Sequence, residues 1–569
     1  MAWYDEAVFY HIYPLGLLGA PMENDHSGVT HRLRELDPWI GHIRELGCNA
    51  LYIGPLFESV GHGYETTDYR KLDSRLGDND DLKAFVKKCH DQGIRVILDG
   101  VFNHTGREFF AFKDLRENRE GSRYRDWYCN VNFYGNNEYN DGFSYDNWGG
   151  FNLLAKLNQR NPEVKDYIAE TIRFWVREFD IDGLRLDAAD VLDFDFMKML
   201  RHVAGEVKDE FWLMGEVIHG DYSRWVNEGT LHSVTNYVMH KAFYSGHNDH
   251  NYFEIAHTQR RLEGMGSSSG SGFRLYNFVD NHDVERIHTK LINKAHFTPV
   301  HILLYTMPGI PSIYYGSEFA IDGKKEKYSD ASLRPKISLS DHADSLKTNP
   351  ATKLIAALGK IRRETKELSY GGYKELLLTN RQYAFSREHE GRSVIVTVNN
   401  DDNGYDMTLP AGSCAVYRGG LSGRIVRASD GVIRVTIDGN SGEIWIPAEG
   451  ESAEEPSCPV SEQIPSSGGA EETPGEGAGT VSGGEAGASV EETGVTSEAP
   501  DVPDNKPSEG KPCENADAER SFEEGVISGL QEAVIAIMEK KGPVTDQMRR
   551  DVYNNTYHDS LITWIKSFN

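Results

Sequence analysis

The chain has 569 residues, 39% of them hydrophobic, and its 60 basic and 88 acidic residues give a formal charge of −28. This length supports several domains and a sizeable core, which excludes a small disulfide-stapled module, and the negative charge argues against nucleic acid as a partner. No apolar run approaches the roughly 20 residues of a membrane-spanning helix, and the first residues lack the basic start of a secretory signal. We therefore expect no membrane contact and a cytoplasmic location.

Residues 1–365 alternate short apolar runs with helical patterns such as 81–92, 162–179 and 194–207. Eight strand–helix units of this length predict an α/β fold, a (β/α)8 barrel, whose chemistry lies where the strands end. A stretch from 103 to 158, rich in Asn, Tyr, Trp, Gly and Asp, predicts a subdomain at 105–158 inserted after the third strand. The predicted strands are 8–13, 50–53, 96–98, 184–186, 212–214, 234–238, 275–279 and 312–315.

The rest of the chain divides into three parts. Short strand patterns at 383–385, 393–398 and 432–437, with turn signals between them, predict a small antiparallel β-sandwich at 366–449. Residues 450–516 contain no Phe, Trp, Tyr, Leu or Met, and 15 acidic against 2 basic residues, which predicts a disordered acidic linker or, alternatively, a specific partner-binding segment. Apolar residues at helical spacing predict a short helical tail at 517–569 that pairs with itself, docks on the main body or binds a partner protein.

The six cysteines are scattered and form no CxxC pair. We expect reduced thiols and no zinc site. Their positions are Cys48, Cys89, Cys129, Cys414, Cys458 and Cys513.

Polar residues follow four of the eight predicted strands. Strand three leads into Asp99, Asn103 and His104, whereas strands four, five and seven lead into Asp187, Glu216 and the run from Asp280 to Asp283. Glycoside hydrolysis needs one carboxyl group that donates a proton and another that attacks or stabilises an oxocarbenium-like transition state. Three carboxylates at one barrel face therefore predict a glycosidase.

Sequence neighbours suggest the roles of these carboxylates. Arg185 shares a strand face with Asp187, so we expect its charge to keep Asp187 ionised as a nucleophile. Glu216 follows an apolar strand without an adjacent cation, which favours a raised pKa and a general-acid role. Asp283, beside His282, is expected to bind sugar hydroxyls and to stabilise positive charge.

Each of these residues also has a structural explanation when it is taken alone. Arg185 and Asp187 would suit a structural ion pair, Glu216 the end of a buried strand, and His104 and His282 hydrogen-bonded core positions. Their convergence on one face is what favours catalysis.

Four segments resemble, in order, the signature regions of the α-amylase family of glycoside hydrolases. They are 99–104 (DGVFNH), 183–189 (GLRLDAA), 215–217 (GEV) and 278–283 (FVDNHD). The resemblance covers about residues 1–447. It implies a retaining mechanism with Asp187 as nucleophile, Glu216 as acid/base and Asp283 as transition-state stabiliser. His104, Arg185 and His282 would contact the sugar, and Tyr64, an aromatic residue that could equally serve packing, resembles the family's stacking tyrosine.

Within that family, residues 154–158 (LAKLN) are similar to a motif of the neopullulanase and cyclomaltodextrinase branch. That branch usually carries an extra N-terminal domain, whereas the first predicted strand here starts near Val8, and it usually has tryptophan where this chain has Ile218. Asp190 stands where many α-amylases have a calcium-binding histidine. Asn103 remains as an oxygen donor, but one donor does not make a Ca²⁺ site, so we expect no required cofactor.

The sequence thus predicts a retaining hydrolase of α-1,4-linked maltodextrins that also tolerates α-1,6 branches. A transglycosylase with the same residues is the nearest alternative. A non-catalytic glycan-binding scaffold is the alternative from another class.

Overall fold

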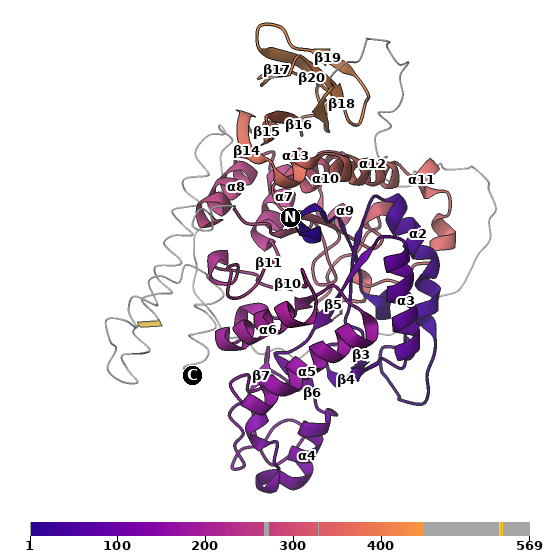
Figure 1. Cartoon of the computed structure of the whole chain (residues 1–569), viewed down its shortest axis with the longest axis vertical. Helices are drawn as coiled ribbons and strands as arrows, with labels where there is room; N and C mark the ends of the chain where they lie inside the picture. Colours follow the sequence, from indigo (N-terminus) through magenta and orange to yellow (C-terminus); the bar gives the residue numbers. More distant parts are fainter. Residues whose placement is uncertain are drawn as a thin grey trace, which may run out of the picture. The chain divides into compact units, whose positions relative to one another are not determined.

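The structure is a computed structural model that describes residues 2–266, 272–327, 329–412 and 414–448, together with Val534, Ile535 and Met538 (Figure 1). The chain divides into two units, 1–471 and 472–569. The barrel, the inserted subdomain and the β structure all belong to the first unit. The predicted linker and almost all of the predicted helical tail lie outside the described residues. Within those residues, no helix has both the length and the apolar character that a bilayer crossing needs.

Eight parallel strands form the barrel, in the order β11-β10-β9-β5-β2-β1-β13-β12. A parallel bridge between Thr235 and Tyr276 joins the two ends of this sheet and closes it. The predicted (β/α)8 barrel is therefore confirmed. The strands are β1 (Phe9–Ile12), β2 (Ala50–Ile53), β5 (Arg95–Gly100), β9 (Gly183–Leu186), β10 (Trp212–Gly215), β11 (Ser233–Val234), β12 (Tyr276–Asn277) and β13 (Ile310–Tyr314).

Helices cover the outside of the barrel, and several begin where a side chain can cap them. Asn161 caps α5 with Pro162 in its first turn, and Asp193 caps α6. Both helices have the bounds predicted from sequence. The main helices are α2 (Asp37–Glu45), α3 (Asn79–Asp91), α5 (Pro162–Phe179), α6 (Phe194–Val207), α7 (Tyr237–Asn248), α8 (Tyr252–Gly266), α10 (Phe297–Thr306) and α12 (Pro350–Glu364). The shorter helices are α1 (Pro14–Leu17), α9 (Ile287–Lys290), α11 (Ser345–Thr348) and α13 (Lys366–Tyr370), and a hairpin of β3 (Phe57–Ser59) and β4 (Thr66–Leu72) follows β2.

The predicted sixth strand, 234–238, is wrong in its second half. The strand ends at Val234, and α7 begins at Tyr237. The reason is a cap, because the Asn236 side chain accepts a hydrogen bond from the Met239 N–H. The apolar residues that read as a strand therefore continue as the first turn of a helix.

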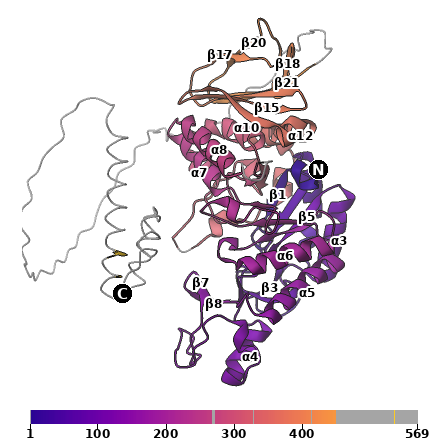
Figure 2. The ribbon, with the colours of Figure 1, turned by 60° about the vertical axis from the view of Figure 1, so that its left-hand side comes forward.

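The excursion after β5 is a small subdomain of its own. Its three-stranded sheet has the order β6-β8-β7. Together with helix α4 it projects from the barrel on the side away from the strands that follow α13 (Figures 1 and 2). The elements are β6 (His104–Gly106), α4 (Phe110–Asn118), β7 (Asn147–Trp148) and β8 (Phe151–Lys156). Because β6 starts at His104, this sheet grows directly out of the barrel rim.

A two-sheet β structure follows α13. Its larger sheet has the order β14-β15-β16-β21-β18-β19, and β17 pairs with β20. The Arg387 side chain on β15 donates to the Thr306 carbonyl, and Arg362 on α12 donates to the Tyr305 carbonyl, so two buried cations meet the carboxyl end of α10. The Arg387 contact joins the β structure to the barrel, whereas the Arg362 contact joins two helices of the barrel. The strands are β14 (Gly372–Leu378), β15 (Gln382–His389), β16 (Arg392–Asn399), β17 (Tyr405–Pro410), β18 (Val416–Gly419), β19 (Ile425–Arg427), β20 (Val432–Ile437) and β21 (Ser441–Pro447).

All four cysteines among the described residues, Cys48, Cys89, Cys129 and Cys414, are free thiols. Cys458 and Cys513 lie outside the described part of the chain.

Candidate active site

The barrel interior is a separate apolar core that ends in polar side chains. Phe9, Ala50, Ile97, Trp212 and Met214 belong to this core cluster. Side chains two residues apart on a strand point to the same face, so the next inward positions are His11, Tyr52, Asp99 and Glu216. The polar site is thus the upper layer of the barrel filling, at the carboxyl ends of the strands.

Arg185 is the centre of this layer. Its Nη1 lies 2.9 Å from Asp187 Oδ1 and 2.9 Å from Asp99 Oδ1, and its Nη2 lies 2.7 Å from Glu216 Oε1. The Arg185 side chain is only 3% exposed. One buried guanidinium therefore gathers carboxylates from three neighbouring strands, and Asp187 and Glu216 are brought together as the sequence predicted.

The raised pKa expected for Glu216 is found, but two other expectations for these carboxylates are wrong: Arg185 does not hold the pKa of Asp187 low, and Glu216 is not without an adjacent cation. Glu216 does have an adjacent cation, because Arg185 reaches it from the next strand. Burial raises the pKa of Asp187 well above its ordinary value and also raises that of Glu216, because desolvation outweighs the attraction of a guanidinium shared by three acids. The pair therefore holds a proton at pH values where exposed carboxyls have lost theirs.

Asp283 behaves in the opposite way. Its Oδ1 accepts a hydrogen bond of 2.8 Å from Arg334, and His282 Nε2 lies 3.1 Å from its Oδ2. Burial by itself would raise the pKa of Asp283, but His282 and Arg334, with help from Arg185 and Lys325, bring it to about 2. Asp283 is therefore a permanent negative charge, with its side chain 34% exposed.

Tyr64 connects the two halves of the site. Its hydroxyl donates to Asp99 Oδ2 at 3.1 Å and also bonds His282 Nε2, and its ring lies parallel to the His282 ring at 5.7 Å. The structure therefore places Tyr64 in a hydrogen-bond chain that runs from Asp283 through His282 and Asp99 to Arg185.

Several buried polar atoms at this rim lack a hydrogen-bond partner within the described residues. They are Nδ1 of His282, Nε2 of His104 and Oδ1 of Asn103. Burial lowers the pKa of both histidines to about 3, so both are neutral at pH 7. Unsatisfied buried polar groups cost stability.

Sequence reasoning missed three participants. Tyr52 donates a 2.8 Å hydrogen bond to Asp99 Oδ2 from β2, Tyr237 donates to Glu216 Oε1 at 3.5 Å, and Arg334 binds Asp283. Tyr52 could have been predicted, because every second side chain of β2 points into the barrel and Tyr52 follows Ala50 in that series. Arg334 and Tyr237 lie in a loop and at a helix start, where no periodicity points to the site.

Calcium takes six to eight oxygen ligands. Within the described residues, the one group of three or more His, Cys, Asp or Glu side chains close enough to share a metal is His31, Asp78 and Asp81, at the start of α3 and not beside Asn103. That group does not include Asn103, and the expectation of no required cofactor stays a prediction.

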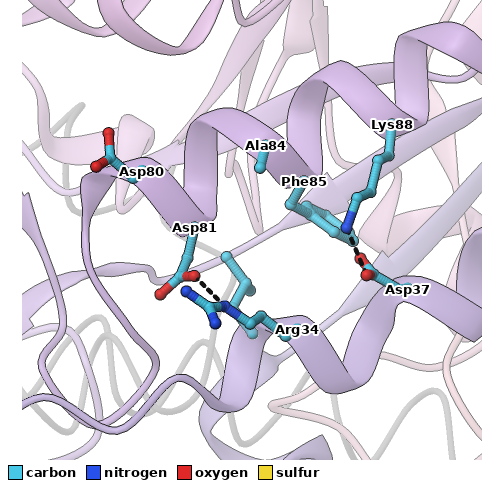
Figure 3. A pocket seen from close by; sticks show the side chains of 8 residues that line it. Arg34, Asp37, Asp80, Asp81, Ala84, Phe85 and Lys88 are labelled. Atoms are coloured by element: carbon cyan, nitrogen blue, oxygen red, sulfur yellow. Dashed lines mark hydrogen bonds and ion pairs between the residues drawn. The ribbon is translucent and has the colours of Figure 1, made fainter.

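The group at α3 borders a cavity of about 310 Å³ between α3 and α2 (Figure 3). Arg34 pairs with Asp81, and Lys88 pairs with Asp37, across this cavity. Asp81 also completes the capping box of α3 with Asp78. The acidic groups here are thus engaged in holding the helix, and the cavity lies apart from the barrel rim.

Comparison with known proteins agrees with this geometry. Residues 24–351 match the family model for the alpha amylase catalytic domain. A cyclomaltodextrinase from Thermoanaerobacter pseudethanolicus is 33% identical over 70% of this chain and 71% of its own length, and neopullulanase 2 from Thermoactinomyces vulgaris is 29% identical over 76% of each.

Solved structures give the same result. The debranching enzyme of Nostoc punctiforme superposes with a TM-score of 0.67 at 25% identity, covering 78% of this chain and 98% of that protein. A cyclomaltodextrinase structure has a TM-score of 0.67 at 26% identity, covering 78% of each chain. On the match of its barrel and the identity with these relatives, the chain belongs to the alpha-amylase family and is a glycoside hydrolase.

Proposed function

We propose that this enzyme hydrolyses the α-1,4 bonds of maltodextrins, tolerates α-1,6 branches, and works by double displacement. The observation that carries the proposal is the single guanidinium of Arg185, which holds Asp187 and Glu216 together while Asp283 stays ionised beside them. The substrate class is supported by the relatives, whose names are cyclomaltodextrinase and neopullulanase.

In the first step Asp187 attacks the anomeric carbon and forms a covalent glycosyl ester. The bond to the leaving oxygen breaks, and that oxygen takes the proton of Glu216. In the second step Glu216 removes a proton from water, the water oxygen attacks the anomeric carbon, and Asp187 leaves as a carboxylate. Because the pKa of both carboxyls is raised, the pair keeps the proton that the first step consumes.

Asp283 would stabilise the positive charge that develops on the sugar ring. Its pKa of about 2 suits this role, since a group that stays ionised costs nothing to deprotonate during reaction. His104, His282 and Arg185 would bind sugar hydroxyls, and Tyr64 would stack on the same ring. No metal or cofactor is needed for these steps.

The role assignment has a direct test with α-maltosyl fluoride, whose leaving group needs no acid. Glu216→Gln should still release fluoride and should gain turnover when azide is added, whereas Asp187→Asn should lose several orders of magnitude of kcat on every substrate. Asp182→Asn, at the opposite end of β9, is the matched control and should keep normal turnover. Fluoride release by Asp187→Asn at a normal rate would overturn the assignment.

Further measurements test the mechanism and separate the alternatives. Proton NMR of the first products should show the α-anomer, as retention requires. Incubation with maltotriose should give shorter sugars, whereas longer products would favour the transglycosylase. Protein that binds maltodextrin but releases no reducing sugar would favour the scaffold.

We also propose a cytoplasmic location, in line with the free thiols and with a relative named intracellular maltogenic amylase in Bacillus subtilis. The proposed boundaries are 1–365 for the barrel with 105–158 inserted, 366–449 for the β-sandwich, 450–516 for the linker and 517–569 for the tail. The tail is the proposed site for any protein partner.

A further inference from the structure

The inserted subdomain carries most of the exposed aromatic rings of the described chain. Phe110, Tyr134, Tyr139 and Phe151 lie between 103 and 158, and only Phe253 and Tyr405 are comparably exposed elsewhere among the described residues. Phe110 contacts the rings of other subdomain residues, so its position has a structural explanation. Tyr134, Tyr139 and Phe151 are the other exposed rings of the subdomain.

Tyr139 is exposed and yet fixed in place. Arg107 lies 3.8 Å from the centre of its ring, and that guanidinium is itself held by Asp141 at 2.6 and 2.8 Å and by the Tyr145 hydroxyl at 2.8 Å. The Tyr139 N–H also donates to the Asn137 side chain. One ring face is therefore covered by a buried cation, while the residue remains 45% exposed. A ring ordered in advance loses little entropy when a ligand stacks on it.

Phe151 begins β8 and is 66% exposed. A hydrogen bond between Asn152 and Glu138, each next to one of the two rings in sequence, ties this segment to the one that carries Tyr139. The two exposed rings therefore stand on segments that are fastened together.

Strand β8 connects Phe151 to the candidate active site. Lys156, at the far end of β8, pairs with His104 on β6. Phe151 is five residues away along the strand, or about 17 Å at 3.3 Å per residue. Phe151 is thus several sugar residues out from the rim, on the strand that ends there, and the Asn152–Glu138 hydrogen bond keeps the Tyr139 segment beside it.

We propose that Tyr139 and Phe151 form an outer surface that binds the part of an α-glucan chain beyond the sugars at the cleaved bond. This rests on the proposed function. Aromatic rings stack on the apolar C–H face of a pyranose, and the neighbours Glu138, Asn140 and Asn152 are polar, which suits a ligand covered with hydroxyls.

The test compares long and short substrates. Tyr139→Ala and Phe151→Ala should each lower kcat/KM for maltoheptaose by roughly three- to tenfold, the range expected for one lost stacking contact, and should leave maltotriose unchanged. Tyr405→Ala, which removes an exposed tyrosine from β17, is the control and should change neither substrate. Equal losses on both substrates, or no loss on either, would overturn the proposal.

A binding measurement separates this proposal from the proposed function. Calorimetric titration of the Asp187→Asn protein with maltoheptaose should show weaker affinity once Tyr139→Ala is added, whether or not the wild-type enzyme cleaves the sugar. If the two ring variants change only the elution volume of the protein in gel filtration, the rings mediate self-association and the glucan surface is refuted.

Discussion

Strand β9 has a carboxylate at each end, and the two carboxylates have opposite pKa shifts. At its start, the Asp182 side chain is 1% exposed. Its carboxylate contacts His90 Nε2 at 2.7 Å and Lys208 Nζ at 2.9 Å, and it accepts a hydrogen bond from the Val96 N–H at 2.9 Å. Burial alone would raise its pKa, but these donors lower it to about 2. At its end, burial raises the pKa of Asp187. We therefore expect Asp182 to stabilise the fold and Asp187 to weaken it.

The contribution of Asp182 to the free energy of unfolding can be calculated from the fall in its pKa. A fall from 3.8 to about 2 is worth about 2.5 kcal/mol, at 1.36 kcal/mol per pKa unit. Because the folded pKa is depressed, this contribution is fully present above pH 4 and is lost as the pH falls toward 2. Asp182→Asn should therefore lower the free energy of unfolding at pH 7 by about 2 to 3 kcal/mol, while kcat well below the melting temperature stays unchanged.

The contribution of the Asp187 carboxyl to the free energy of unfolding has the opposite sign. A carboxyl whose folded pKa is raised costs stability as the pH rises through that value, so Asp187→Asn should leave the fold as stable or make it more stable at pH 7 while it abolishes turnover. Urea unfolding followed by circular dichroism, with maltotriose hydrolysis measured in parallel, checks both variants. An unchanged urea midpoint for Asp182→Asn, or an equal loss for the two variants, would refute the reasoning.

Three more predictions follow. Tyr52→Phe removes the hydroxyl that orients Asp99, and should lower kcat roughly tenfold with little change in KM, whereas Tyr276→Phe, whose hydroxyl bonds Ser312 in the same barrel interior, should not; equal kcat values would contradict a positioning role. Dialysis against EDTA should leave maltotriose hydrolysis unchanged, and lost activity that Ca²⁺ restores would show that a calcium site exists. Truncation at Gly450 should leave a folded, active enzyme, because a segment that cannot build a core should not support the barrel; insoluble protein would show that the tail docks.

The barrel could be predicted from sequence because each strand is an apolar run that fills either the lumen or the layer under the helices. The sites at the strand ends followed from that assignment. The environment of Glu216 could not be predicted in the same way. Arg185 pairs with Met214 across β9 and β10, so it stands beside Glu216 only after the sheet has formed. The spacing along one strand predicts that Arg185 lies beside Asp187, but it cannot predict that Arg185 also lies beside Glu216 on the next strand.

The same limit applies to Arg334 and Tyr237. Arg334 comes from the loop after β13 and reaches Asp283 from 51 residues further along the chain. Tyr237 begins helix α7, although the sequence predicted that it lies in a strand at 234–238. Residues that complete a site from loops and helix starts are placed by tertiary packing, and periodicity carries no information about them.

The opposite pKa shifts around the rim have one chemical meaning. Asp99, Asp187, Glu216 and Asp283 face two guanidiniums, Arg185 and Arg334, so acidic groups outnumber cations in a site that excludes most water. Burial therefore disfavours full ionisation of the site and raises the pKa of Asp187 and Glu216, and the neighbouring carboxylates add to this effect. In the proposed mechanism, a sugar that develops positive charge would relieve this excess, so the field that destabilises the free enzyme would favour the transition state over the substrate. Asp283 remains the fixed charge because Arg334 and His282 bind it outside the crowded centre.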